Sequence, residues 1–181
     1  QKRELTLDSS EAMASVETDA DNRPERLSLD IKEIALRHNG DPALRGERLQ
    51  LHSRPTPGMP DGLDLAVNGK ALEVAEGALP FNIVALPRTA KLVDLQATVT
   101  GLPEGGITLG GLPQWRDGGG TLEIKKLRLQ WGDMDISATG SLALDGEMRP
   151  IGALTAQIKG HDQLLDIAAA NHMMDEDDMV T

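Results

Sequence analysis

The segment Leu122–Gln130, LEIKKLRLQ, nearly repeats the upstream segment Leu29–Arg37, LDIKEIALR. In both segments apolar and polar residues alternate, and in both the alternation changes parity at a charged pair, Lys125-Lys126 or Lys32-Glu33. Successive side chains of a β-strand point to opposite faces, so an apolar set that changes parity needs a bulge or tight bend to keep facing one side. We therefore predict two equivalent strand pairs, each bent at its charged pair.

Alternation of this kind predicts a mostly β fold, either a curved antiparallel sheet or an open β-groove or sandwich, with one or two short helices. The predicted inward face is aliphatic. It consists of Leu27, Leu29, Ile31, Leu63, Leu65, Leu72, Val74, Leu127, Leu129, Ile136, Leu142 and Leu154. A sheet that leaves its seam open would offer this face to acyl chains, which need apolar area and little directional bonding. In a sheet that closes, or is covered by a terminal helix, the same residues are a core, which is the commoner fate of such residues.

Three strand connections follow from the turn residues. Asn68-Gly69 is typical of a two-residue hairpin turn, which would place Leu65 opposite Leu72 and Leu63 opposite Val74.

A Gly132-Asp133 turn would set Leu129 against Ile136 and Trp131 against Met134. In the third connection, a longer loop would bring Leu142 opposite Ile151, with a bulge at Gly152 that returns Leu154, Ala156 and Ile158 to the same face.

The chain of 181 residues is expected to form one domain, 1–181, with a glycine-rich loop at 101–120 and a solvated acidic tail at 175–181. Strand-like runs also lie at 93–100 and 5–7, and a breaker-rich loop at 54–62. One helix is predicted at Asp162–Met174, and a shorter one near Leu79–Leu86.

Composition restricts the function classes. A net charge of -11 disfavours binding to nucleic acid and to anionic lipid head groups at long range. One Phe, two Trp and no Tyr leave almost nothing to stack on bases or sugars. The absence of Cys excludes disulfides and thiol chemistry, and no apolar run approaches the ~20 residues that span a bilayer.

No residue pattern predicts catalysis or metal binding. The four histidines, His38, His52, His161 and His172, lack partners at zinc-ligand spacing, and exposed loop positions explain them. There is no GxSxG motif, and Gly118–Gly120 lacks the Lys-Ser/Thr of a phosphate loop. Carboxylate pairs such as Asp133 with Asp135 are too common in an acidic chain to indicate glycoside hydrolysis. We expect no enzyme activity, no cofactor and no metal.

The run Gly118–Leu165 resembles a proteobacterial family defined as a domain of unknown function. The matching residues are Leu129, Trp131 and Gly132; Ala138, Gly140, Leu142, Leu144 and Asp145; and Arg149, Pro150, Gly152 and Leu154. Upstream, Arg54-Pro55 followed by Leu63 and Leu65 is similar too. The resemblance implies a periplasmic protein tethered to the inner membrane by an N-terminal segment absent from this chain. The strand-and-glycine pattern is also similar, more loosely, to AsmA-like envelope proteins, whose curved sheets are thought to guide lipids between membranes.

Together these observations lead us to expect a non-enzymatic, periplasm-facing protein of the bacterial cell envelope that binds or guides a lipid or other apolar ligand. Its expected ligand-binding residues are Leu29, Ile31, Leu63, Leu65, Leu72, Leu129, Ile136 and Leu142. The alternative is an interaction module with a closed core and no ligand, which docks another envelope protein through a sheet edge or the 101–120 loop.

Overall fold

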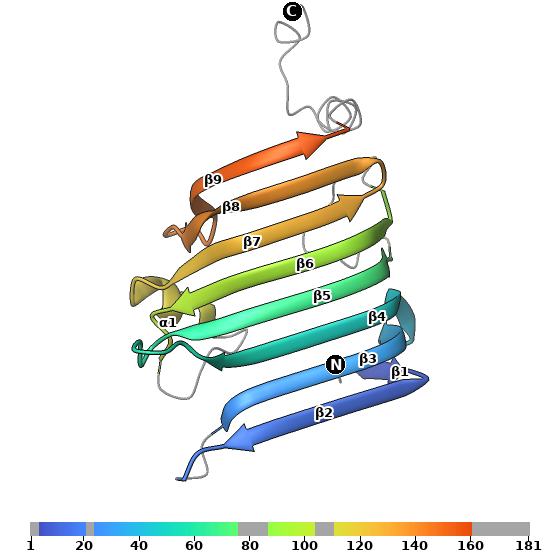
Figure 1. Ribbon diagram of the computed structural model, residues 1–181, viewed down its shortest axis with the longest axis horizontal. Coiled ribbons are helices and arrows are strands. Elements are labelled where there is room, and N and C mark those ends of the chain that lie inside the picture. Colours follow the sequence, from blue (N-terminus) through green and yellow to red (C-terminus); the bar gives the residue numbers. More distant parts are fainter. Residues whose placement is uncertain (1–3, 21–23, 76–86, 104–110, 161–181) are drawn as a thin grey trace, which may run out of the picture.

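The computed structural model describes residues 4–20, 24–75, 87–103 and 111–160, and these form one open antiparallel sheet of nine strands (Figure 1). The elements are β1 (Leu5–Asp8), β2 (Glu11–Thr18), β3 (Pro24–His38), β4 (Asp41–Pro55), β5 (Leu63–Val74), β6 (Thr89–Thr100), α1 (Leu112–Asp117), β7 (Thr121–Trp131), β8 (Met134–Leu144) and β9 (Pro150–Lys159). Both helices predicted at 79–86 and 162–174, and the acidic tail, lie outside the described residues.

From β3 to β9 each strand pairs with the next in sequence, so the strand order is a simple meander. β1 and β2 share one edge, because β1 pairs with the C-terminal part of β3 and β2 with the rest of that strand. No pairing joins this edge to β9 in the described part of the chain, so the sheet is not closed. Of the two arrangements weighed from the sequence, an open or a closed sheet, the described residues therefore form the open one.

The predicted bends are confirmed at both charged pairs. Glu33 has a φ of 50°, and the apolar residues change parity there from Ile31 to Ile34, both buried. In β7 the register shifts between Ile124 and Leu127, so Lys125-Lys126 forms a bulge. The two bends differ in kind, because β3 bends together with its neighbours whereas β7 bulges alone.

The bend of β3 continues across the sheet as a crease, defined by Glu33, Glu47, Ala71 and Lys91 on β3 to β6. These exposed residues stand opposite one another, since the pairs on either side of them keep one register. Ala71 has a φ of 49°, close to that of Glu33. Because all four strands change parity in the same row, the apolar residues on both sides of the crease stay on one face.

The expected hairpin at Asn68-Gly69 is wrong. β5 runs straight through this dipeptide, and Asn68 pairs with Gln50 on one side and Asp94 on the other. A different Asn-Gly pair makes a turn: Asn39-Gly40 joins β3 to β4, with φ values of 53° and 90° that suit a tight hairpin.

Two other connections behave nearly as predicted. The Gly132 turn sets Leu129 against Ile136 and Trp131 against Met134, which confirms that register. Between β8 and β9 the prediction is off by one residue, because Leu142 pairs with Gly152 and the ladder has no bulge. Leu154, Ala156 and Ile158 nevertheless lie on the predicted face.

The 101–120 stretch, expected to be a loop, contains α1, a six-residue helix. Its Trp115 is buried, and the indole N–H donates a 2.7 Å hydrogen bond to the Thr100 carbonyl at the end of β6. Gly120 packs directly against the indole ring, since a Cβ there would lie 2.2 Å from Trp115 Nε1. The helix therefore packs at one end of the sheet (Figure 1).

Candidate functional site: an aliphatic sheet face

The eight residues expected to bind ligand lie on one face of the sheet, which we call the aliphatic face. Pairing places Leu65 beside Ala97 and Ser53, and Leu129 beside Val93 and Ile136, all with the same orientation. Its members include Val16, Leu27, Leu29, Ile31, Ile34, Leu49, Leu51, Leu63, Leu65, Val67, Leu72, Val93, Leu95, Val99, Leu122, Ile124, Leu127, Leu129, Ile136, Leu142, Leu154 and Ile158. The prediction that these side chains share one face is therefore confirmed.

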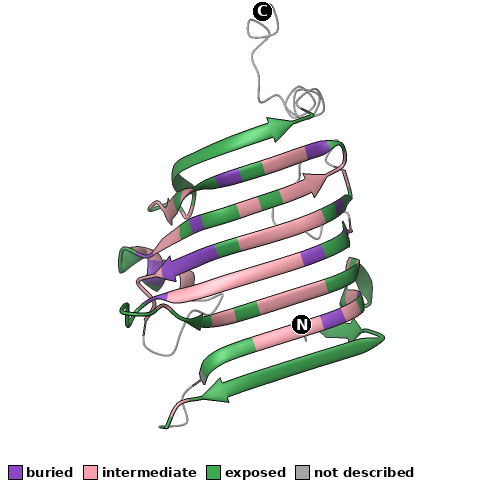
Figure 2. Ribbon diagram, in the orientation of Figure 1, coloured by how far each residue is buried: buried purple, intermediate pink, exposed green. Residues whose placement is uncertain are grey.

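The edge strands β2 and β9 are exposed along their whole length, whereas the strands between them contain buried and half-buried residues (Figure 2). Ile31 and Leu72 are buried, and the other six predicted residues are half-buried. Toward the edges Leu27 is 38% exposed, Leu154 50% and Val16 56%. The described residues place no second sheet or layer of helices over this face.

The aliphatic face is large. Seven strand spacings separate its two edges, which makes it about 34 Å wide, and an eleven-residue strand such as β7 is about 36 Å long. The product, roughly 1,200 Å², is the footprint of the sheet and not exposed area, because Ile31, Ile34 and Ile124 on this face are buried. Leu27, Leu154 and Val16 remain exposed on it, and contiguous exposed apolar residues are typical of an interaction site.

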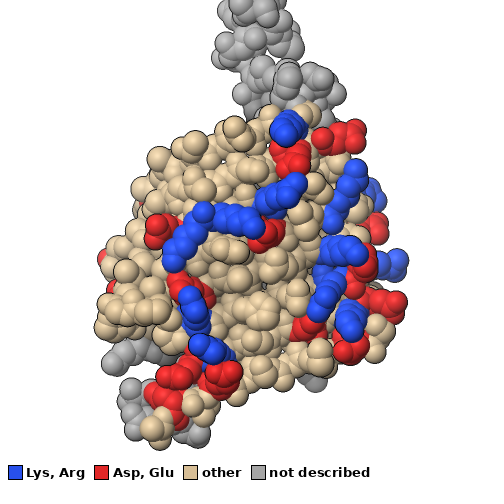
Figure 3. Space-filling view, in the orientation of Figure 1, with Lys and Arg blue, Asp and Glu red and all other residues tan. Residues whose placement is uncertain are grey.

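The opposite face carries charge pairs between neighbouring strands. Arg48 Nη2 lies 2.5 Å from Asp30 Oδ2, and Lys126 Nζ lies 2.5 Å from Asp94 Oδ2. The hydrogen bond from Arg48 lowers the pKa of Asp30, against a smaller opposing effect of burial. Figure 3 shows basic side chains gathered in two bands over this face, with acidic ones beside them and uncharged surface between.

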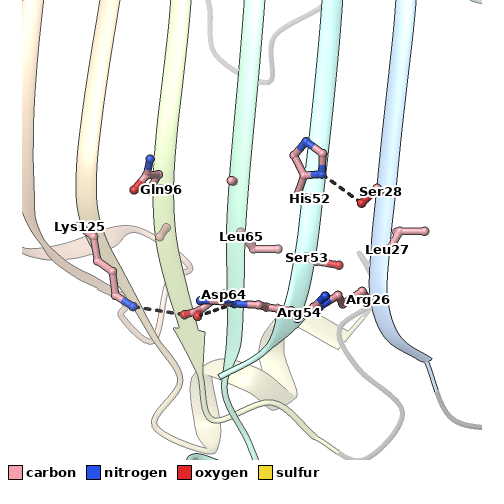
Figure 4. A pocket seen from close by; sticks show the side chains of 12 residues that line it. Arg26, Leu27, Ser28, His52, Ser53, Arg54, Asp64, Leu65, Gln96 and Lys125 are labelled. Carbon is pink, nitrogen blue, oxygen red and sulfur yellow. Dashed lines mark hydrogen bonds and ion pairs between the residues drawn. The ribbon is translucent and has the colours of Figure 1, made fainter. Parts of the chain in front are cut away.

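Asp64 holds the best-connected carboxylate on the charged face (Figure 4). Its Oδ1 accepts hydrogen bonds from Thr98 Oγ1 at 2.7 Å, Thr56 Oγ1 at 3.2 Å and Lys125 Nζ at 3.2 Å. Its Oδ2 accepts one from Arg54 Nε at 3.3 Å. The hydrogen bond from Thr98, followed by those from the other partners, lowers the pKa of Asp64 to about 2, although partial burial acts the other way.

A hollow of about 400 Å³ opens beside Asp64 on the charged face. Its rim carries Arg26, Arg54 and Lys125, and further in lie His52 and Gln96. His52 Nδ1 is 3.1 Å from Ser28 Oγ. The sequence did not predict this site, because its side chains come from five strands. The pair Lys125-Lys126 at the β7 bulge was the one local feature that pointed to it.

The histidines and carboxylates considered as catalytic or metal-binding residues do not form a common site in the described residues. His38 and His52 stand at opposite ends of β3 and β4, and His161 and His172 fall outside the described residues. Within the described ranges, no three His, Asp or Glu side chains come together as metal ligands. Asp135 pairs with Gln130 and Arg128, and the hydrogen bond from Gln130 is the main cause of its lowered pKa.

In the described residues a single open antiparallel sheet, aliphatic on one side and charged on the other, defines the class of protein: a mostly β protein. The chain belongs to the bacterial family described as "Uncharacterized protein conserved in bacteria (DUF2125)", whose family model matches residues 1–181. No curated protein and no solved structure matches the chain. No helix in the described ranges has the length and apolar character needed to cross a membrane.

Proposed function

We propose that this chain is a non-enzymatic protein of the bacterial cell envelope that binds or guides a lipid or a similar aliphatic ligand along its aliphatic face. One observation carries the proposal: the face extends across the whole open sheet, and Val16, Leu27 and Leu154 remain exposed on it. Exposed aliphatic side chains are costly in water, and an apolar partner would remove that cost.

The chemistry of the face favours acyl chains over other apolar ligands. It is built mainly from aliphatic side chains, with Trp131, Met134 and Ser53 among the exceptions, so it offers apolar area with few directional contacts. Each buried methylene contributes about 0.8 kcal/mol, so ten of them would supply about 8 kcal/mol before the costs of immobilising the ligand. A flexible chain can follow the twist of the sheet, which a rigid ring system cannot.

The location is proposed from sequence resemblance. The resemblance to the bacterial family, and more loosely to AsmA-like envelope proteins, favours the periplasm, with a tether to the inner membrane. In that setting an open sheet that shields acyl chains from water would serve lipid transit across an aqueous compartment.

Native mass spectrometry of protein purified gently from its bacterial host tests the proposal. We expect a bound lipid in a defined mass range, released when the protein is denatured. Repeated detection of lipid-free protein alone, from preparations whose membranes were solubilised mildly, would contradict it.

Four exposed residues provide matched variants. Leu27→Ser and Leu154→Ser remove apolar contacts from the aliphatic face, where these residues are 38% and 50% exposed. Met13→Ser and Ile151→Ser are the controls, since these residues are 55% and 51% exposed but point to the charged face. Lipid occupancy should fall in the first pair and not in the second.

A second candidate function rests on the β9 edge. All residues of β9 are exposed, and in the described chain the strand pairs only with β8. It has one charged residue, Lys159, whereas β2 at the other edge carries Glu11 and Glu17, which discourage strand addition. β9 could therefore accept a strand from another envelope protein.

Cross-linking in cells tests this second function. The chain has no cysteine, so Thr155→Cys on β9 provides a unique attachment point for a photo-cross-linker. Thr139→Cys is the control, since Thr139 pairs with Thr155 from the inner strand β8. One reproducible protein adduct from Thr155→Cys alone would support edge docking, and adducts of similar yield from both variants would contradict it.

A further inference from the structure

The hollow beside Asp64 contains cationic side chains whose hydrogen-bond donors are only partly occupied by the described residues. Arg54 contacts Asp64 through Nε alone, so its two terminal nitrogens have no partner in the described ranges. Within the described ranges Arg26 has one long contact, 3.5 Å to Glu17, and both of these side chains are well exposed. Such a surface pair contributes little and is easily exchanged for another partner.

Arg26 and Arg54 are neighbours on adjacent strands. Leu27 pairs with Ser53, so the next residues in the register are Arg26 and Arg54, directly across from each other. Like charges in this arrangement repel one another unless an anion lies between them. Figure 4 shows both guanidinium groups on the same rim of the hollow.

The charge balance of the hollow is opposite to that of the chain. Arg26, Arg54 and Lys125 contribute +3 and Asp64 contributes -1, which leaves +2, or +1 if Glu17 is counted, while the whole chain carries -11. Within a Debye length of about 8 Å at physiological salt, the nearby charges dominate what an anion experiences.

We propose that the hollow beside Asp64 binds a phosphate group, held by the terminal nitrogens of Arg54, with Arg26 and Lys125 to either side along the rim (Figure 4). Asp64 positions Arg54 and Lys125, because it accepts hydrogen bonds from both. An arginine guanidinium group donates two parallel hydrogen bonds to phosphate oxygens, which the terminal nitrogens of Arg54 can supply.

The shape of the hollow indicates a substituted phosphate. Its volume of about 400 Å³ is far more than a bare ion occupies and falls in the range that holds small organic ligands. Ser28, His52 and Gln96 line the inner part, so polar side chains are in place to form hydrogen bonds with the substituent. A phosphate ester could come from a lipid head group or from a soluble metabolite.

This site is independent of the proposed lipid function, because the hollow opens on the face opposite the aliphatic residues. NMR amide shifts of the full chain, recorded at constant ionic strength, test it with three probes: inorganic phosphate, dihexanoyl phosphatidate below its micelle concentration, and dihexanoylglycerol, which lacks the phosphate. We expect saturable shifts around Arg26, Arg54 and Gln96 with at least one phosphate probe and none there with dihexanoylglycerol.

The variants separate a site from general charge attraction. Arg54→Gln should weaken binding at least about tenfold, since it removes both the positive charge and the paired N–H donors of the guanidinium group. Arg45→Gln is the matched control, on the same strand and face but at the other end of β4. Arg54→Lys keeps the charge but lacks the paired N–H donors, so we expect it to bind with intermediate affinity. This variant tests the site even if Arg54→Gln perturbs the fold.

The two sources give different results. Binding of inorganic phosphate as tight as that of the phosphatidate assigns the site to soluble phosphates; binding of the phosphatidate alone, lost in Arg54→Gln, assigns it to a lipid head group. Either result supports the phosphate site. No saturable shift with either phosphate probe, or equal weakening by Arg45→Gln, would overturn it.

Discussion

The side chain of Leu72 fills the space above Gly69, three residues earlier on the same strand. A Cβ at Gly69 would lie 2.4 Å from Leu72 Cδ1, and a Cβ at Gly46 on β4 would lie 2.5 Å from Leu72 Cδ2. Leu72 is thus seated between two glycines beside the crease, where its exposed fraction falls to 8%. Glycine serves here as room for a neighbour, and not as a turn residue.

Substituting Gly69 tests this packing. Gly69→Ala should lower the free energy of unfolding by about 1–3 kcal/mol, because the new methyl group forces Leu72 to move within a packed site. Urea denaturation followed by circular dichroism measures the change. Gly146→Ala is the control, since a Cβ there meets nothing within 4 Å, and equal losses in the two variants would contradict the packing account.

At the crease, a substitution to glycine should leave the stability unchanged or raise it, whereas a substitution of Gly69 should lower it. Glu33 is exposed with a φ of 50°, a conformation that costs a residue with a side chain about 1–2 kcal/mol, so Glu33→Gly should be neutral or slightly stabilising. Glu123→Gly, at an exposed and regular position of β7, should cost about 0.5–1 kcal/mol. Thermal unfolding of both variants decides the matter, and a lower melting temperature for Glu33→Gly than for Glu123→Gly would show that the left-handed residue is not strained.

These cases show which features could be predicted from sequence. The bends at Lys32-Glu33 and Lys125-Lys126 were predictable, because a change of parity marks a bulge wherever one face stays apolar. The dipeptide Asn-Gly was ambiguous: it turns the chain at Asn39-Gly40, whereas Asn68-Gly69 has a strand on each side. Local turn chemistry contains no information about strands that pair from elsewhere in the chain.

The candidate site also has features that the sequence could predict and features that it could not. The eight apolar residues could be assigned to one face, because their alternation and the bends are local properties of each strand. Whether the sheet closes depends on the summed twist of nine strands and on its two edges, which no single segment reveals. The Asp64 hollow was beyond reach for a related reason, since Arg26, Arg54 and Lys125 meet only through the pairing of β3 to β7.

Asp64 predicts a pH dependence of stability. Its pKa is about 2 in the folded protein and near 3.9 in an unfolded chain, so the carboxylate stabilises the fold fully above about pH 5 and loses that effect as the pH falls toward 2. Asp64→Asn should therefore cost on the order of 1 kcal/mol at pH 7, after allowance for solvent screening. Urea titrations at several pH values measure the difference, which should shrink between pH 4 and pH 2. A difference that is constant across this range would indicate that lost shape, and not lost charge, destabilises the variant.

Trp131 offers a direct reading of the aliphatic face. It pairs with Ala90 and Met134, both buried, its side chain is half-buried on that face, and its indole N–H donates to the Pro87 carbonyl. In a Trp115→Phe background it is the sole tryptophan, because the chain has only two. Lipids brominated in their acyl chains should quench its fluorescence in a saturable manner, since bromine quenches only on close approach, and unbrominated lipids of the same head group should not. Leu27→Ser and Leu154→Ser should weaken the quenching, while Met13→Ser leaves it unchanged. If lipid remains bound by mass but Trp131 is not quenched, the ligand occupies some other surface, and the aliphatic face is not its site.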